Sequence, residues 1–322
     1  MNVVVLGGAT PAGARLAALL RESGWARPVL LRPHDPATGE ALAGADAVVD
    51  CSGTARAALE RRGDWMQACV AAKRPRLVVL GSARAYGAMQ GRVEEGSAWP
   101  RSVDAEVRGW RAVENAARAC AAAGGEVVVL RAGPLWGNGL PLVRRLATAL
   151  RERRLGDLGE HGDGWTNLVP LDDACLAIVR ALQLPLQRGD WRCYNLAAPD
   201  SPRWNDLFFD LALGIAATPL PRIAPWRVAA QQWIATPLLD VLRGMDPRDD
   251  AGLPLAISRA EAAAWRLQQR LDATAATADL RLDWTPYPAV LADVVAWEVR
   301  QHSLERLRRV GAGTGRPARR GL

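Results

Sequence analysis

Short apolar runs alternate with amphipathic stretches from the N-terminus to about residue 196. Between the runs, apolar residues recur every three or four positions, as at Leu16, Leu19 and Leu20, and this spacing predicts helices. The runs are four to six residues long and predict buried strands at residues 3–6, 28–32, 45–50, 77–80, 126–130 and 193–196. Strands that alternate with helices in this way predict an α/β fold built on a doubly wound parallel sheet.

A glycine-rich turn follows the first predicted strand. Residues 7–13 read G-G-A-T-P-A-G and lead directly into a helix. Glycines let the backbone approach a bound pyrophosphate closely, and the free amides of a helix N-terminus face that anion. The candidate cofactor-binding residues of this turn are Gly7, Thr10, Pro11, Ala12 and Gly13. A turn without a ligand is the alternative, because the spacing is G-x-x-T-x-x-G and not the dinucleotide-binding G-x-G-x-x-G.

The second predicted strand ends at Arg32, where the adenosine ribose of a dinucleotide lies in folds of this kind. An arginine suits a 2′-phosphate, whereas an acidic residue accepts a hydrogen bond from a 2′-hydroxyl. Arg32 therefore favours NADP over NAD as the cofactor, and a solvated charge at a strand end is the alternative interpretation. Only residues 33–45 precede the next strand, so we expect one short helix there and a sheet that lacks one edge strand.

The loop of Cys51, Ser52 and Gly53 follows the third predicted strand. Ligands of open parallel sheets bind outside the carboxyl ends of the strands. These three residues are therefore further candidates for contact with a cofactor.

The alternation of strands and helices ends after residue 139. Residues 139–160 predict a basic helix and loop, and residues 201–270 predict helices interrupted by prolines. Asp172 and Asp173 precede a helix predicted at 174–182, a position where a carboxylate caps free backbone amides. Aromatic residues of the later helices are interpreted as core and not as a recognition surface; they are Trp204, Phe208, Phe209, Trp226 and Trp233.

Composition limits the compartment and the class of the protein. Its 49% hydrophobic and 23% charged residues are typical of a globular chain. No run of about 18 apolar residues occurs, and the N-terminus begins in a strand, so we expect a cytoplasmic protein with no membrane span. Five cysteines without a C-x-x-C pair predict buried thiols, with neither a disulfide framework nor a metal site.

The net charge of +7 is concentrated at the C-terminus. Residues 303–322 hold six arginines against Glu305 alone, which accounts for +5 of the +7. The rest of the chain is nearly neutral, which argues against specific nucleic-acid binding. The glycines and the proline of this segment predict a disordered, solvated tail, with weak binding to an anionic surface as the alternative.

Seven segments resemble, in order, the landmarks of the extended short-chain dehydrogenase/reductases, the family of nucleotide-sugar epimerases and dehydratases. They are the strand and glycine turn at 3–13, then 46–50, 81–87, 130–137, 171–173, 194–196 and 282–286. The resemblance spans residues 2–298 and implies a Rossmann-type fold, a nicotinamide cofactor and a small or nucleotide-linked substrate. Through the family's R-P-x-x-x-Y-G segment it also implies cofactor contacts for Gly133 and Pro134, and it allows a homodimer.

The same resemblance implies a division into domains. Residues 1–170 are expected to form the dinucleotide-binding domain, to which residues 171–198 return. Residues 199–302 are expected to form a smaller, mainly helical substrate region, and residues 303–322 the basic tail.

The family's catalytic Y-x-x-x-K pair is missing from this chain. A glutamate that often follows the pair matches Glu114, which places Glu106 at the tyrosine position and Trp110 at the lysine position. Lys73 is the only lysine of the chain and lies elsewhere, and the three tyrosines lie in other landmarks or, for Tyr287, directly after one. We therefore expect altered proton-transfer residues.

Three residues remain as catalytic candidates. Ser82 matches the family's serine that hydrogen-bonds the substrate oxygen, with capping of local backbone as the alternative. Glu106 is a substitute base if burial raises its pKa, with a solvated helix charge as the alternative, and Tyr86 is a displaced acid. Thr10 replaces a glycine that approaches the pyrophosphate, so its branched side chain is expected to crowd the cofactor.

Two functions remain open on the sequence alone. The first is an NADP-dependent oxidoreductase or epimerase-like enzyme with atypical proton-transfer residues. The second is a catalytically inactive relative that senses a dinucleotide or holds a protein partner.

Overall fold

The computed structural model describes residues 1–32, 35, 37–71, 76–102, 104–230 and 259–313. Its strands are β1 (Asn2–Leu6), β2 (Arg27–Leu31), β3 (Ala47–Asp50), β4 (Arg76–Ser82), β5 (Gly91–Val93), β6 (Glu126–Ala132), β7 (Leu135–Trp136), β8 (Val169–Pro170), β9 (Trp191–Leu196) and β10 (Gln269–Leu271). The first helices are α1 (Pro11–Ser23), α2 (Thr38–Ala43), α3 (Ala55–Glu60), α4 (Arg62–Ala71), η1 (Ala83–Tyr86) and α5 (Ala105–Ala122). The later helices are α6 (Pro141–Arg151), η2 (Gly159–Gly162), α7 (Leu171–Gln183), α8 (Trp204–Gly214), α9 (Pro225–Ala230), α11 (Arg259–Trp265), α12 (Thr274–Asp279) and α13 (Tyr287–Gly313).

The central sheet is parallel and has the order β2-β1-β3-β4-β6-β9. The chain passes from β1 to β2 on one side and then returns to build the sheet on the other side, so the strand order reverses between β1 and β3. This confirms the predicted doubly wound α/β fold. In the described part of the chain β2 is the edge strand, and only the short helix α2 separates it from β3, as expected for residues 33–45.

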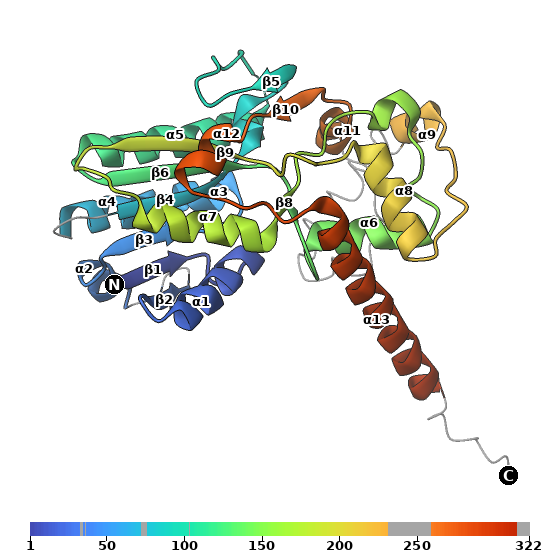
Figure 1. Cartoon of the computed structure of the whole chain (residues 1–322), viewed down its shortest axis with the longest axis horizontal. Coiled ribbons are helices and arrows are strands. Elements are labelled where there is room, and N and C mark those ends of the chain that lie inside the picture. The colour runs from blue at the N-terminus through green and yellow to red at the C-terminus, as the bar shows by residue number, and fades with distance from the viewer. Residues whose placement is uncertain (33–34, 36, 72–75, 103, 231–258, 314–322) are drawn as a thin grey trace, which may run out of the picture.

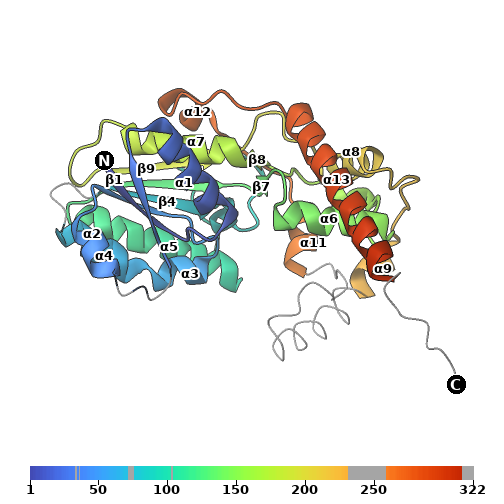
Figure 2. The same cartoon turned by 90° about the horizontal axis from the view of Figure 1, so that it is seen from below.

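Helices cover both faces of the sheet (Figures 1 and 2). Helices α1 and α7 pack on one face, where Leu16 and Ile178 belong to one buried cluster with alternate residues of the strands. Helices α3, α4 and α5 pack on the other face, where Trp65 and Trp110 are buried. The inner strands read as nearly continuous apolar runs because both of their faces are covered. The strand predicted at 28–32 was expected to be buried, but it lies at the sheet edge as β2, where Val29 and Leu30 are 40% and 38% exposed.

A second core lies among the C-terminal helices. Buried residues of α6, α8, α11 and α13 form it, and Figure 1 shows these helices grouped beside the sheet. The core does not follow the expected boundary at residue 170, because α6 packs with the helical region. Residues 269–282 also depart from the expected 199–302 region: β10 pairs with β5, and Leu280 and Leu282 join the core of the sheet.

Helix α13 extends away from the rest of the molecule (Figure 1). It continues to Gly313, so residues 303–313 are helical and not part of a disordered tail; the remainder of the expected tail lies outside the described residues. None of the described helices is long and apolar enough to cross a lipid bilayer. The aromatic prediction holds for Trp204 and Phe208, but Phe209 and Trp226 are 52% and 67% exposed, and Trp233 lies outside the described residues.

The expected capping role of two neighbouring aspartates is wrong. Helix α7 begins at Leu171, one residue before Asp172, so both carboxylates lie within its first turn. Asp172 pairs with Arg15 at 2.7 Å, whereas Asp173 accepts hydrogen bonds from the backbone N–H and the hydroxyl of Thr285, both at 2.8 Å. The two residues therefore join α7 to other elements.

The sequence predicted buried thiols at the five cysteines. All five are free thiols. Four of them are buried, and Cys193 is half-buried.

Candidate functional site

The glycine turn lies at the point where the strand order reverses. Gly7 has a φ of +76°, and a Cβ added to it would lie 2.6 Å from the Cys51 carbonyl. A Cβ added to Gly13 would lie 2.3 Å from the carbonyl oxygen of Gly7. Larger residues cannot occupy either position without a shift of the backbone, so this sequence forms a tight strand-to-helix turn at the site where doubly wound sheets bind ligands.

Thr10 closes the turn from inside. Its side-chain oxygen lies 2.8 Å from the Gly7 carbonyl and 2.9 Å from the Cys51 carbonyl, and it accepts a hydrogen bond from the Gly13 amide at 3.1 Å. The hydroxyl therefore caps α1 and binds the turn to the loop after β3. The Thr10 hydroxyl therefore points into the turn, and crowding of a cofactor by the branched side chain stays a prediction.

The N-terminus of α1 keeps one free donor. Pro11 has no N–H, and the amides of Gly13 and Ala14 are bonded to Thr10. The Ala12 amide has no acceptor within the described residues. One amide without an acceptor and the positive end of the helix dipole therefore lie at the start of α1, and these groups fit the pyrophosphate of a dinucleotide.

A buried carboxylate supports the loop of Cys51, Ser52 and Gly53. Asp50, which is 1% exposed, accepts hydrogen bonds from the Ser52 amide at 2.8 Å and from the Trp65 indole at 2.9 Å. Burial raises the pKa of Asp50 to about 6. The Cys51 side chain points into the core and contributes only its carbonyl to this edge, while Gly53 adopts a φ of +79°.

Arg32 directly follows β2 at the same edge of the sheet. Its side chain is exposed and has no hydrogen-bond or ion-pair partner in the described part of the chain. A guanidinium in this position is available to a bound anion.

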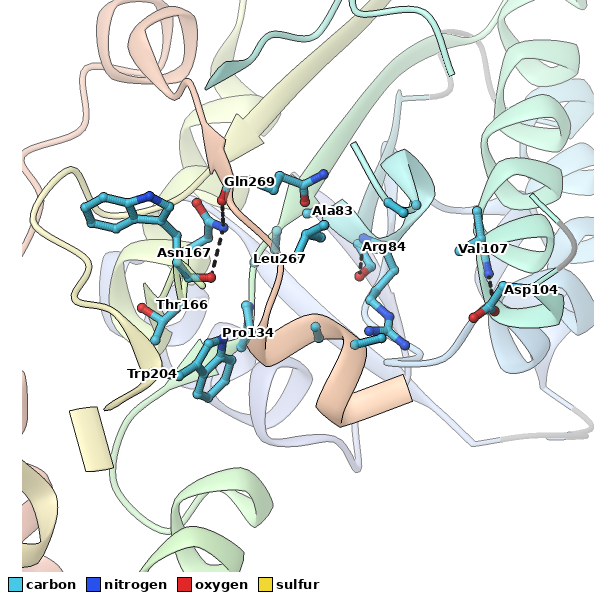
Figure 3. A pocket seen from close by; sticks show the side chains of 18 of the residues that line it. Ala83, Arg84, Asp104, Val107, Pro134, Thr166, Asn167, Trp204, Leu267 and Gln269 are labelled. Atoms are coloured by element: carbon cyan, nitrogen blue, oxygen red, sulfur yellow. Dashed lines mark hydrogen bonds between the residues drawn. The ribbon is translucent and has the colours of Figure 1, made fainter. Parts of the chain in front are cut away.

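A cavity of about 380 Å³ lies between the carboxyl ends of β4 and β6 and the C-terminal helices. Ser82, Arg84, Gly133, Pro134, Asn167 and Trp204 are among the residues that line it. Figure 3 shows Val107 of α5 and Asp104, which caps that helix, on one side and Thr166, Asn167 and Trp204 on the other. The cavity therefore brings Ser82 together with Gly133 and Pro134, three residues that the sequence had selected.

Close packing fixes one wall of this cavity. A Cβ added to Gly133 would lie 1.9 Å from the Asn167 carbonyl, so only glycine fits there. Asn167 has a φ of +49° and holds β10 through two hydrogen bonds, to the Gln269 carbonyl at 2.8 Å and from the Leu271 amide at 2.9 Å. This network attaches β10 to the sheet side of the cavity.

Ser82 and Glu106 occupy different environments. Ser82 lines the cavity, and its hydroxyl oxygen accepts a hydrogen bond from the Arg84 amide at 3.2 Å, which caps η1. The Glu106 side chain is 49% exposed and pairs with the Arg84 guanidinium at 2.7 Å. Glu106 does not line the described cavity, so its carboxylate reaches the cavity only through its partner Arg84.

Tyr86 is fully buried and does not line the cavity. Its hydroxyl accepts a hydrogen bond from Arg131 at 2.6 Å and donates one to the Asn195 side chain at 2.7 Å. Burial raises the pKa of Tyr86 to about 12. Since Arg131 in turn pairs with the buried Glu114 at 2.8 Å, the tyrosine belongs to an internal polar network.

Several cavity residues escaped the sequence reasoning. They are Trp165, Thr166, Asn167, Trp204, Leu267 and Gln269. Trp204 belongs to the helical core, as interpreted, but it also lines the cavity, which the sequence did not indicate. The others lie in segments without a recognised motif. The positive φ of Asn167 leaves only a weak signal, since asparagine adopts this conformation in many ordinary turns.

Solved structures with the same architecture cover nearly the whole chain. MoeE5 in complex with UDP-glucose and NAD has a TM-score of 0.69 at 18% identity, and the match covers 94% of this chain and all of that one. The UDP-glucuronic acid 4-epimerase from Bacillus cereus in complex with UDP-glucuronic acid and NAD has a TM-score of 0.70 at 14% identity, with the same coverage. The human epimerase family protein SDR39U1 with NADPH has a TM-score of 0.65 at 17% identity and covers 92% of this chain and 99% of its own.

No protein-family model matches the sequence, and no curated protein matches it. At identities of 14% to 18% the structural similarity shows the fold. The chain therefore has the fold of the NAD-dependent epimerases and extended short-chain dehydrogenase/reductases, as its seven segments predicted.

Proposed function

We propose that this protein is an NADP-dependent oxidoreductase that acts on a small molecule in the cavity beside Ser82. The proposal rests on the observation that the glycine turn, the loop at 51–53 and the exposed Arg32 lie together at one edge of the sheet. The groups at this edge suit the binding of a dinucleotide, and the cavity lined by Ser82, Gly133 and Pro134 lies at the same edge.

The fit to a dinucleotide rests on groups of this chain. The turn leaves no space for side chains at Gly7 and Gly13, and the Ala12 amide is free to donate to a phosphate oxygen. Arg32 is exposed where a 2′-phosphate is expected, which supports NADP over NAD. When bound, the nicotinamide supplies or accepts a hydride.

The residues of the cavity then have separate roles. Ser82 donates its hydroxyl hydrogen to a substrate oxygen and thereby orients the substrate. Glu106 holds the Arg84 guanidinium at the wall, because its carboxylate pairs with Arg84 and lies outside the cavity. Tyr86 holds Arg131 and Asn195 together in the interior.

Calorimetry with NADPH and NADH tests the cofactor. Arg32→Ala is expected to weaken NADPH binding by about tenfold, because the variant loses a charge-assisted hydrogen bond to the 2′-phosphate. Binding of NADH should change by less than about twofold, since NADH lacks that phosphate.

Arg27, at the opposite end of β2 and also exposed, provides the matched control. Arg27→Ala should leave both affinities unchanged. Equal losses for NADPH and NADH in Arg32→Ala would contradict the assignment of the 2′-phosphate, and no binding of either cofactor to the wild type would contradict the proposed function.

A non-catalytic dinucleotide sensor is the second candidate. The resemblance that places Glu106 and Trp110 at the family's tyrosine and lysine positions favours it. The Glu106 carboxylate is half-exposed and paired with Arg84, and Trp110 is 5% exposed, so neither environment is that of a free proton donor in the cavity. NADPH oxidation in the presence of a panel of ketones and aldehydes separates the two candidates. Tight NADPH binding without oxidation by any of them supports the sensor.

A further inference from the structure

Arg84 is the cation among the described residues that line the cavity. It lies two residues after Ser82 on η1, the short helical turn that follows β4. In Figure 3 its side chain extends from η1 into the space between Pro134 and Asp104. The side chain is 32% exposed, so it is not sealed in the core. The turn therefore brings a positive charge to the wall that also holds the serine.

The guanidinium group of Arg84 uses one of its nitrogens within the described part of the chain. Nη2 donates a hydrogen bond to the Glu106 carboxylate at 2.7 Å, whereas Nε and Nη1 have no acceptor there. A guanidinium carries five N–H donors in a planar fork and can bind a carboxylate through two of them at once. Arg84 therefore keeps donors for a second carboxylate.

The ion pair with Glu106 is easily exchanged. The two side chains are 32% and 49% exposed, and an ion pair between exposed side chains contributes about 1 kcal/mol or less. The Glu106 carboxylate lies outside the cavity, so it can turn into solvent when another carboxylate takes its place. Glu106 therefore occupies Arg84 in the absence of a ligand and competes weakly with one.

The negative charge of Asp104, the other charged residue of the described lining, is directed at a helix. Its carboxylate accepts hydrogen bonds from the backbone N–H groups of Glu106 at 2.8 Å and Val107 at 3.2 Å, and it caps α5. These amides and the positive end of the helix dipole offset its charge. Asp104 therefore leaves the Arg84 charge available to a ligand.

Ser82 supplies a neutral donor on the same wall. Its hydroxyl oxygen accepts a hydrogen bond from the Arg84 amide at 3.2 Å, and its hydroxyl hydrogen has no acceptor within the described residues. Since a hydroxyl can donate and accept at the same time, Ser82 can donate to a ligand oxygen without losing this contact. The wall thus presents one charged and one neutral donor.

The remaining lining limits the charge and the body of the ligand. A nucleoside diphosphate carries two negative charges, and the described lining has a single cation to pair with them. Val107, Pro134, Trp165 and several alanines make the rest of the wall largely apolar. This combination favours a ligand with one negative charge and a hydrocarbon or aromatic body.

We propose that the cavity binds a monoanionic oxo acid with an apolar body. Its carboxylate displaces Glu106 from the Arg84 guanidinium, and its oxo oxygen accepts a hydrogen bond from Ser82. This inference rests on the proposed function, because it names the substrate class of that same cavity. Arg84 is therefore a specificity-determining residue that selects a carboxylate over a neutral group of the same shape.

A pair of probes of the same shape tests the charge. Phenylglyoxylate is an aromatic oxo acid, and phenylglyoxylamide has a neutral amide in place of its carboxylate. We expect calorimetry with the full-length protein to show about fivefold tighter binding of the acid, which is the effect of one net hydrogen bond. Added salt should reduce this preference, because the Arg84 side chain is partly exposed.

Two arginine variants assign the preference to one side chain. Arg84→Gln removes the charge and keeps a polar side chain, so the preference for the acid should fall to about one. Arg56 is a matched control, because it also pairs with a glutamate, is 90% exposed and does not line the cavity. Arg56→Gln should keep the preference.

A third variant tests the competition by Glu106. Glu106→Gln removes the competing carboxylate, so phenylglyoxylate should bind at least about twofold more tightly, and the affinity for the amide should not change. If Glu106 were needed to hold the wall in shape, both affinities would fall instead. An unchanged or weaker affinity for the acid would overturn the proposed displacement.

The outcomes that overturn the inference are distinct from failure of the proposed function. Equal affinities of the wild-type protein for the two probes, no binding of the acid, or a preference that survives in Arg84→Gln would overturn it. NADPH binding is measured in the same samples. Its absence beside an intact preference for the acid contradicts the proposed function and leaves the cavity assignment standing.

Discussion

At the scale of single residues, Asp50 supports the edge of the sheet at which the dinucleotide is proposed to bind. Its carboxylate is buried behind the loop at 51–53 and accepts hydrogen bonds from Ser52 and Trp65. Burial disfavours the charged form and raises the pKa from 3.8 to about 6, although the two hydrogen bonds act in the opposite direction. The geometry of the loop is therefore coupled to the protonation of one carboxyl group.

The raised pKa of Asp50 predicts a dependence of stability on pH. Between about pH 4 and pH 6 the folded state binds this proton more tightly than the unfolded state. The stabilisation is therefore fully present below the unfolded pKa and is lost as the pH rises through 6. We expect Asp50→Asn to abolish this contribution.

Urea unfolding of the wild type and of Asp50→Asn at pH 4.5 and pH 7.5 measures the effect. The free energy of unfolding of the wild type, relative to the variant, should be about 2 kcal/mol larger at the lower pH. If the difference in free energy of unfolding between the two proteins did not change with pH, that result would contradict the raised pKa of Asp50.

At this scale the backbone geometry restricts three of the residues that the sequence selected. No side chain fits at Gly7, Gly13 or Gly133, while their contact with a cofactor stays a prediction. The direction of a side chain could not be predicted, so the hydrogen bonds of the Thr10 hydroxyl within the turn were not foreseen.

At the scale of elements, Asp173 joins α7 to the segment that leads into α13. The carboxylate accepts two hydrogen bonds from Thr285, each at 2.8 Å, and burial raises its pKa. Thr285 lies between α12, which packs on the sheet, and α13, which packs in the helical core. The contact therefore fixes the return of the chain from one core to the other.

Neighbouring substitutions test this junction. Asp173→Ala should lower the free energy of unfolding by about 1 to 3 kcal/mol, because it leaves the Thr285 amide without an acceptor. Asp172→Ala removes an ion pair in which the aspartate is 62% exposed, and should change stability by less than about 1 kcal/mol. Similar effects of the two substitutions in urea unfolding would contradict the role of Asp173.

The inner strands β1, β3, β4 and β6 were predictable, because each is a short apolar run that is mostly or fully buried. The β5–β10 pair was not, since each strand has three residues and the partners lie far apart in the sequence. The capping role of Asp172 and Asp173 failed for a similar reason: helix α7 begins earlier than the apolar period indicates, and the partners of both carboxylates are distant in the sequence.

At the scale of the whole molecule, two cores meet around the cavity beside Ser82. Seven ordered segments were enough to predict the fold, because each is a local pattern of residues. The cavity could not be predicted, since its wall joins segments that only the folded chain brings together: 82–88, 102–107, 132–134, 165–167, 204 and 263–269. The fold agrees with that of structures solved with NAD or NADPH.

The central claim is that the turn at 7–13 holds a dinucleotide, and amide hydrogen exchange with and without NADPH tests it most directly. Bound NADPH should slow exchange in peptides that cover residues 7–13 and 28–32, because phosphate oxygens and the adenosine occupy that edge of the sheet. Peptides of α6, which packs in the helical core, should be unchanged and serve as the internal control. Unchanged exchange in the glycine turn at saturating NADPH, or slower exchange only in the helical core, would contradict the claim.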